Sequence, residues 1–323
     1  MTDCARAMVA QTEARRASGA ARKILQIAIS GIAIYLIARH VDLRDAGRVL
    51  ASARPHYVIV AVLLYLLGQV MSAYRWRLIG VAVGLTDGFV RYVRFYFIGM
   101  FFMFFGPSTL GGDLVRGLYL AEGGKRRARA LNSVLFDRLN GMVVLIAIGA
   151  VAFVLPPGYG LPRALFYLTV AFGSALFLGW WTAPLLVRTL LPAEHRLRRF
   201  IIVDLGPFWR DRAMLVGASA VSLAFHFVQI LTQLVVGRAL GLVLPFGYVC
   251  IFHPLVSTLS ALPITLSGIG LREGGYLWFL TRIGVADANA VAFGGLWLLV
   301  IVINSLIGGL VFVLGGARLP RLR

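Results

Sequence analysis

Two short stretches of the chain repeat a set of residues suited to binding an anion. Residues 107–116 read PSTLGGDLVR and residues 263–272 read PITLSGIGLR, so Pro, Thr, Leu, Gly and Arg recur in the same register. Proline and glycine interrupt helices, and the first turn of a helix presents free N–H groups and a positive dipole end. Arg116 and Arg272 add permanent charge close to those helix starts. The pattern therefore predicts two half-helices that hold one anion, such as a phosphate headgroup.

A local ion pair is the alternative role for each arginine. Asp113 lies three residues before Arg116, and Glu273 directly follows Arg272. A helical pair of this kind contributes about 0.2–0.5 kcal/mol at a surface. A charge at the centre of a bilayer costs at least roughly 2.5 kcal/mol. The comparison favours a binding role, because local pairing alone offsets little of that cost.

Two further segments carry polar residues within apolar sequence. Asp137 and Arg138 in SVLFDRLNG fit an interfacial ion pair as well as they fit a part of the site. His226, Gln229 and Gln233 lie on a polar stripe at helical spacing, which is more often a contact between helices than a ligand site. We keep these three as secondary candidates. The predicted substrate-binding residues are Thr109, Gly111, Gly112, Asp113, Arg116, Asp137, Arg138, Thr265, Gly268, Gly270, Arg272 and Glu273.

Little in the sequence supports covalent chemistry. It contains no GxSxG, HExxH or P-loop motif, and its two cysteines, Cys4 and Cys250, form neither a disulfide framework nor a metal cluster. We therefore expect no catalytic residue, no metal and no cofactor. Two alternatives stay open. One is a membrane-embedded transferase that acts on a lipid phosphate with Asp113 or Glu273 as base. The other is a non-transporting partner of a lipid synthase that docks through the basic loop 122–130.

The composition places these residues in a membrane protein. Hydrophobic residues make up 59% of the chain and charged residues 14%, and the mean hydropathy is +0.85. A soluble domain is closer to half apolar and a quarter charged. The net charge of +19 does not argue for nucleic-acid binding, because the basic residues cluster between apolar runs. That distribution is typical of cytoplasmic loops beside anionic lipid.

The apolar runs predict an all-α polytopic membrane protein. A crossing needs roughly 17–25 apolar residues. The stretches 92–121 and 246–282 are interrupted by Gly, Pro and charge, and we expect them to be re-entrant or broken helices. Because they carry the repeated motif, they predict an inverted repeat of the kind found in secondary transporters. The six expected full crossings are 24–38, 57–74, 131–155, 163–191, 213–236 and 290–315.

We expect one integral membrane domain, residues 23–316, between a polar tail at 1–22 and a basic tail at 317–323. Repeat one is expected at about 57–191 and repeat two at about 213–315. No long soluble domain interrupts this region, so the expected function lies in or at the bilayer.

The basic clusters predict that both termini face the cytoplasm in the cytoplasmic (inner) membrane. One of these clusters, expected just after the second crossing, comprises Arg75, Arg77, Arg91 and Arg94. The loop 39–54 conflicts with this topology, because it carries four arginines on the expected outer side. An interfacial amphipathic helix in that loop would reduce the conflict.

At PSTLGGDLVRG, SVLFDRLNG and LPITLSGIGLREGG the sequence resembles the lysylphosphatidylglycerol synthase transmembrane-region family. These flippase-like proteins also form the N-terminal half of the multiple peptide resistance factor. The resemblance covers about residues 20–316 and implies a fold that translocates an anionic lipid, which is aminoacylated, glycosylated or linked to a polyprenyl phosphate. The sequence shows no aminoacyltransferase domain, so we do not expect an enzyme. The expected partners are that lipid, the membrane, and a second copy or a lipid synthase.

Overall fold

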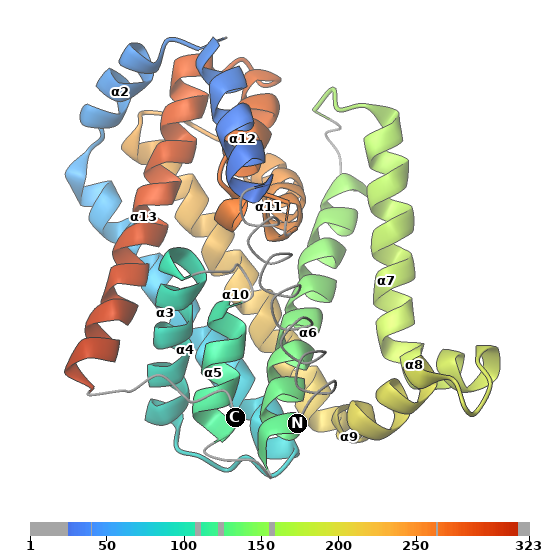
Figure 1. The fold of residues 1–323 in the computed structure, drawn as a ribbon. Helices are drawn as coiled ribbons and strands as arrows, with labels where there is room; N and C mark the ends of the chain where they lie inside the picture. Colours follow the sequence, from blue (N-terminus) through green and yellow to red (C-terminus); the bar gives the residue numbers. More distant parts are fainter. Residues whose placement is uncertain are drawn as a thin grey trace, which may run out of the picture.

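The computed structural model describes residues 25–39, 41–106, 111–121, 126–154, 159–262 and 264–315, and these residues form helices and no strands. Figure 1 shows the arrangement of the helices. A π-helical turn, Phe200–Asp204, joins α8 (Arg196–Arg199) to α9 (Gly206–Arg210), and a 3-10 turn, Leu266–Gly268, precedes α12 (Leu271–Thr281). The α-helices are Leu25–Arg39, α2 (Leu43–Ala51), α3 (Pro55–Ala82), α4 (Phe89–Phe105), α5 (Gly111–Ala121), α6 (Arg127–Val154), α7 (Arg163–Leu190), α8 (Arg196–Arg199), α9 (Gly206–Arg210), α10 (Arg212–Ala239), α11 (Phe246–Ala261), α12 (Leu271–Thr281) and α13 (Asp287–Leu314).

Five helices in the described part of the chain are long and apolar enough to cross a membrane: α3, α6, α7, α10 and α13. Each has 28 residues, or about 42 Å at 1.5 Å per residue, which matches a bilayer with its headgroup regions. Five of the six predicted crossings fall on these helices. The sixth corresponds to Leu25–Arg39, which turns by 91° into α2, so the two qualify only as one bent pair. The all-α polytopic fold is confirmed.

Both predicted broken segments consist of two helices with an interruption between them. Residues 92–121 lie on α4 and α5, and residues 246–282 lie on α11, the 3-10 turn and α12. In the second segment Gly268 and Gly270 have φ angles of 75° and 90°, a conformation that glycine adopts without steric cost. Figure 1 shows α4 and α5 in the lower half of the molecule and α11 and α12 in the upper half.

The helices form two matched sets, α3 to α6 and α10 to α13. The two sets have helix lengths of 28, 17, 11 and 28 residues and of 28, 16, 11 and 28 residues. Helix α3 packs along its counterpart α10. Helix α4 packs on α13, and in the same way its counterpart α11 packs on α6. Such reciprocal contacts are expected of two halves related by a twofold axis. The matched halves are 55–154 and 212–314, so α7 lies between them rather than within repeat one.

Helix α7 stands on the outside of this bundle (Figure 1). Only Thr169, Gly173 and Trp180 of α7 are buried. Its lower end is held by an aromatic cluster, in which Phe136 contacts the rings of Trp180 and Trp209.

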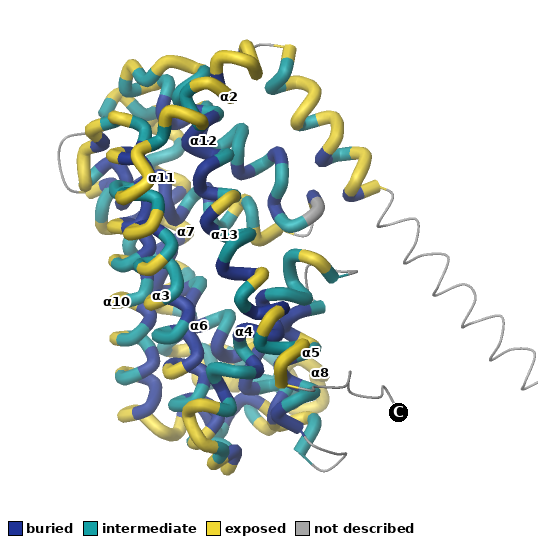
Figure 2. The backbone as a smooth tube through the Cα atoms, turned by 90° about the vertical axis from the view of Figure 1, so that its left-hand side faces the viewer, coloured by how far each residue is buried: buried dark blue, intermediate teal, exposed yellow. Residues whose placement is uncertain are grey.

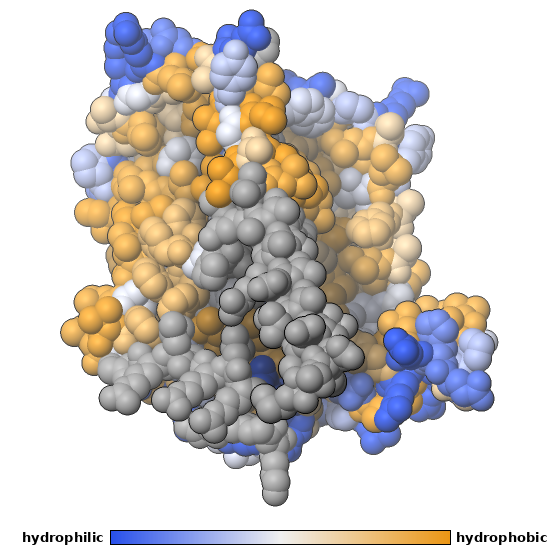
Figure 3. Space-filling view, in the orientation of Figure 1, coloured by the Kyte–Doolittle hydropathy of each residue, from blue (hydrophilic) through white to orange (hydrophobic). Residues whose placement is uncertain are grey.

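The surface of the bundle has the polarity of a membrane protein. Figure 3 shows an apolar middle between hydrophilic upper and lower ends. Figure 2 shows that the buried residues follow the inner sides of the helices.

The loop 39–54 contains the expected helix. The side chain of Asp42 accepts a hydrogen bond from the backbone N–H of Arg44 at 2.8 Å and thereby caps the start of α2. Of the residues of α2, only Ala46 is buried. A helix with one buried residue and exposed arginines is suited to lie at an interface, although its depth in a membrane stays a prediction.

Candidate functional site

Arg75 is a buried residue of α3, so the prediction that it belongs to a cytoplasmic loop cluster is wrong. Helix α3 continues to Ala82, beyond the predicted end of this crossing at residue 74. The side chain of Arg75 is 6% exposed, and its Nε donates to Oδ1 of Asp137 at 2.7 Å. The sequence signal that would have found it is the polar spacing on α3, where Gln69 and Ser72 precede Arg75 at three-residue intervals.

Arg116 connects both acids of the cluster. Its Nε donates to Oδ1 of Asp113 at 3.1 Å, and its NH2 donates to Oδ2 of Asp137 at 3.0 Å. The guanidinium also lies 4.8 Å from the ring centroid of Trp76 and 4.9 Å from that of Tyr96. Such cation–π contacts stabilise a desolvated cation. NH1 of Arg116 is buried and has no hydrogen-bond partner among the described residues.

The cluster has one more positive than negative charge. Arg138 pairs through Nε with Oδ2 of Asp113. Arg75, Arg116 and Arg138 thus face two carboxylates, those of Asp113 and Asp137. The side chain of Arg138 is 36% exposed, whereas the other four are between 1% and 12% exposed. Uncompensated charge is costly in a low-dielectric site, so the cluster is suited to accept one anion.

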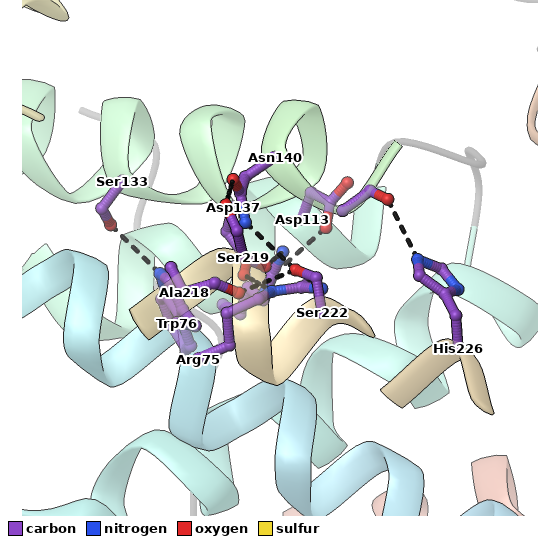
Figure 4. Close-up of polar contacts among 12 residues, drawn as sticks. Arg75, Trp76, Asp113, Ser133, Asp137, Asn140, Ala218, Ser219, Ser222 and His226 are labelled. Atoms are coloured by element: carbon purple, nitrogen blue, oxygen red, sulfur yellow. Dashed lines mark hydrogen bonds and ion pairs between the residues drawn. The ribbon is translucent and has the colours of Figure 1, made fainter. Parts of the chain in front are cut away.

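A layer of hydrogen bonds orients the cluster (Figure 4). Ser222 on α10 accepts from Arg75 NH1 at 3.0 Å and from Asn140 Nδ2 at 3.0 Å. Ser219 donates to Oδ1 of Asn140 at 3.0 Å. A Cβ atom at Gly141 would lie 3.0 Å from NH1 of Arg75, so the glycine leaves room for the guanidinium. Helix α6 of the first half, through Asp137, and helix α10 of the second half, through Ser222, thereby fix the position of Arg75.

A cavity of about 380 Å³ lies against the cluster. At roughly 30 Å³ per water, it has the volume of about a dozen waters. Its polar lining includes all five charged residues of the cluster together with His226, and methionine and leucine side chains line much of the rest. We call this the first cavity.

A second cavity of about 220 Å³ contains Arg272 in its lining. NH2 and Nε of Arg272 donate to Oε1 of Glu273 at 2.7 and 3.0 Å, and Oε2 of Glu273 accepts from the N–H of Gly270 at 2.6 Å. Arg116 and Arg272 therefore lie in different cavities rather than in one. The two cavities adjoin, because they share five lining residues: Tyr96, Met100, Met103, Arg138 and Ala261.

The two arginines also differ in their place on the helices. Arg116 is the sixth residue of α5, whereas Arg272 is the second residue of α12. The break between α11 and α12 runs over 262–270 and is four residues longer than the break at 106–110. The four extra residues place Arg272 about one helical turn closer to the start of α12 than Arg116 is to the start of α5.

Among the described residues, the charged cluster therefore lies in the first half and has no counterpart in the second. In the matched helices the positions of Arg75, Arg116 and Asp137 are taken by neutral residues, which are Thr232, Tyr276 and Trp297. Glu273 corresponds to Asp113, since both are the third residue of their helix. The two halves have the same order and nearly the same lengths of helices, but they differ in the positions of their charged side chains.

The predicted glycines have structural roles beside the cavities. A Cβ at Gly112 would lie 2.1 Å from the carbonyl oxygen of Gly99, so α5 approaches α4 too closely for any side chain there. Gly111 begins α5. Gly268 and Gly270 have the positive φ angles, 75° and 90°, that the turn before α12 requires. Thr265 is buried in the break before α12, and Thr109 lies outside the described residues, as do Pro107 and Pro263.

Two of the secondary candidates form contacts between helices. Gln233 donates through Nε2 to the hydroxyl of Tyr276 at 3.0 Å. Gln229 lies beside Gly68, where α3 and α10 approach each other. His226 differs from both, because it also lines the first cavity. The described residues contain no group of three or more His, Cys, Asp or Glu side chains placed to hold a metal ion.

Comparison with known proteins places the chain beside a described family and a membrane protein of an archaeon. The profile of the family described as lysylphosphatidylglycerol synthase TM region matches residues 23–309. A UPF0104 membrane protein of Methanocaldococcus jannaschii is 28% identical over 102 residues, which cover 31% of this chain and 30% of that protein. The match thus spans about a third of that relative's length. No solved structure matches the chain.

Proposed function

Because the chain belongs to the lysylphosphatidylglycerol synthase TM-region family, a family of multi-pass membrane proteins with a lipid-related role, we propose that it moves an anionic lipid across the membrane. The headgroup binds where the first and second cavities adjoin. The observation that carries the proposal is the cluster of three arginines and two aspartates, which has a net charge of +1, is buried except at Arg138, and lines the first cavity.

The position of the cavities supports transport. Their lining comes from the broken segments of both halves, including Met103 on α4 and Ala261 on α11. In transporters built from inverted repeats, the substrate binds at the repeat interface beside discontinuous helices. A site that is exposed alternately to the two sides of the membrane has to lie between two halves that move against each other, and this site is lined by residues of both.

The chemistry of the lining supports an anionic headgroup. Arg138 lines both cavities and is the most exposed arginine of the cluster. Arg116 lines the first cavity, and its NH1 has no hydrogen-bond partner in the part of the chain that the structure describes, while Arg272 lines the second cavity. Arginine forms bidentate, charge-assisted hydrogen bonds to phosphate. The substrate class is a phospholipid of the cytoplasmic membrane, aminoacylated or glycosylated, or a lipid linked to a polyprenyl phosphate. All of these carry the phosphate that the arginines bind, so phosphatidylglycerol serves as the probe for the class.

A transferase receives less support from the same geometry. Asp113 accepts from Arg116 and pairs with Arg138, while Glu273 accepts from Arg272 and from the N–H of Gly270. A carboxylate whose oxygens already accept from such partners has few lone pairs left to accept a substrate proton. The proposal therefore assigns these acids to holding the arginines.

A scrambling assay tests the proposed function. Purified protein is reconstituted in liposomes that contain phosphatidylglycerol with a fluorescent headgroup-side label, and an impermeant reductant quenches the label in the outer leaflet. If the protein moves labelled lipid from the inner to the outer leaflet, the reductant quenches more than half of the total fluorescence. We expect Arg138→Gln to slow this process at least tenfold, because it removes the guanidinium common to both cavities.

The matched control is Arg126→Gln. Arg126 pairs with Asp87 at 2.7 Å outside both cavities, so this variant keeps the wild-type rate. Equal rates for Arg138→Gln and the wild type would remove the headgroup site. Quenching that stops at the outer leaflet for the wild type, together with a new lipid product by mass spectrometry, would favour the transferase.

A further inference from the structure

Two histidines lie next to each other beside the arginine cluster. His226 on α10 and His253 on α11 have ring centroids 6.0 Å apart and are 6% and 4% exposed. Nε2 of His226 lies 3.0 Å from the carbonyl oxygen of Gly141 on α6 (Figure 4). Nδ1 of His253 lies 3.5 Å from Oγ of Ser257. Both histidines belong to the second half of the protein, and His226 also lines the first cavity.

Each ring has one nitrogen with no hydrogen-bond partner in the described part of the chain. These atoms are Nδ1 of His226 and Nε2 of His253. Buried polar atoms are nearly always hydrogen-bonded, so such an atom calls for an explanation. The hydroxyls of Ser72 and Thr258 also have no partner among the described residues, and both line the first cavity with His226. Imidazole, unlike these hydroxyls, gains or loses a proton near neutral pH.

The charges around His226 link its protonation to the contents of the cavity. The cluster beside it has a net charge of +1, so in the empty cavity an additional positive charge on the ring is repelled. A singly charged oxyanion in the cavity cancels that excess, removes this repulsion and so shifts the ring toward the imidazolium form. Helix α13 carries no titratable side chain other than Asp287 in its first turn, and α9 carries only Arg210, which is exposed. Arg75 of α3 acts on His226, and the first cavity that His226 lines also contains Asp113 and Arg116 of α5 and Asp137 and Arg138 of α6. Helix α12, which packs against α11, carries Arg272, Glu273 and Tyr276.

We propose that His226 and His253 form a proton-binding site that is filled when an oxyanion enters the first cavity. Two imidazolium rings with centroids 6.0 Å apart repel each other, so the pair takes up one proton for each anion. The anion and the proton then move together, and a proton gradient supplies the driving force. This inference depends on the proposed function, because it names the ion coupled to headgroup binding at the same site.

Titration calorimetry at one pH in buffers of different ionisation enthalpy measures the proton uptake. The probes are dimethyl phosphate and dioctanoyl phosphatidylglycerol, which have the same phosphodiester charge and do not titrate near neutral pH. The slope of the observed enthalpy against buffer ionisation enthalpy gives the protons taken up per bound probe. We expect uptake approaching one proton in the wild-type protein.

The variants separate the histidine pair from the anion site. In His226→Gln the amide retains a donor for the carbonyl of Gly141, and we expect binding without proton uptake. His253→Gln gives the same result if His226→Gln fails to fold, and His56→Gln, at an exposed position, keeps the wild-type uptake. Uptake with both probes assigns the effect to the phosphate alone, and uptake with only the lipid assigns it to the whole headgroup.

Two outcomes overturn the inference in different ways. Binding of either probe to the wild-type protein without proton uptake refutes the proton site and leaves the proposed function intact. Failure of both probes to bind refutes the anion site, and with it both proposals.

Discussion

Replacing Asp137 with Asn tests whether the charge cluster holds the first half of the protein together. Asp137 is 1% exposed and accepts from Arg75 at 2.7 Å and from Arg116 at 3.0 Å. It therefore joins α6 to α3 and to α5. Asn preserves the size of the side chain but removes its charge, and it presents an amide donor to one of two arginine donors. The net charge of the cluster then rises from +1 to +2.

The cost follows from the burial of both arginines. Removing one partner of a buried ion pair destabilises a protein by about 3–5 kcal/mol, because the remaining charge is left uncompensated. Each kcal/mol lowers Tm by about 2 °C in a chain of this size. We therefore expect Asp137→Asn to lower Tm by roughly 6–10 °C.

Thermal unfolding in detergent, followed by intrinsic fluorescence, measures this change. The control is Asp45→Asn, whose pair with Arg48 has side chains 51% and 77% exposed, so a change of about 2 °C or less is expected. The double variant Asp137→Asn/Arg75→Gln removes one uncompensated charge, and we expect it to regain part of the loss. If Asp137→Asn unfolds within 1 °C of the wild type, the cluster does not stabilise the protein and the reasoning is refuted.

Three further substitutions test individual features of the fold by the same unfolding measurement, with Gly274→Ala as the common control, because a Cβ at Gly274 meets nothing within 4 Å. Gly112→Val places side-chain atoms against the carbonyl of Gly99, and we expect a loss of about 3 kcal/mol or more; an unchanged Tm would show that α4 and α5 are not in contact there. Gly270→Ala forces alanine to a φ of 90°, with an expected loss of about 1–3 kcal/mol, and no loss would mean that the turn before α12 has another conformation. Trp209→Phe removes the 2.8 Å hydrogen bond from its indole N–H to the carbonyl of Trp180 and should cost about 0.5–1.5 kcal/mol; a stabilised variant would contradict that role for α9.

The long helices and the broken segments could be predicted because apolar length and helix-breaking residues act locally. A run of apolar residues of bilayer length has few alternatives to a helix. The exact end of a helix depends on tertiary contacts as well as on the local sequence, and the length of the apolar run alone places Arg75 in a loop. Helix α3 extends eight residues past the predicted end, to Ala82, and Arg75 lies inside the protein, where Asp137, 62 residues away in sequence, compensates its charge.

The repeated decapeptides predicted the breaks but not the positions of the arginines. Sequence similarity aligned Arg116 with Arg272, whereas the longer break before α12 shifts Arg272 by one turn. The local pairs Arg116–Asp113 and Arg272–Glu273 are both present. The link from Arg116 to Asp137 depends on how α5 packs against α6, and spacing along the chain carries no information about such packing.

An experimental structure of the protein in nanodiscs containing phosphatidylglycerol, determined by electron cryomicroscopy with a bound antibody fragment, tests the anion site most directly. The account predicts phosphate density where the two cavities adjoin, within hydrogen-bonding distance of Arg138 and of NH1 of Arg116. Headgroup density found only around the outer surface, with the cavities closed or occupied by water alone, would contradict it.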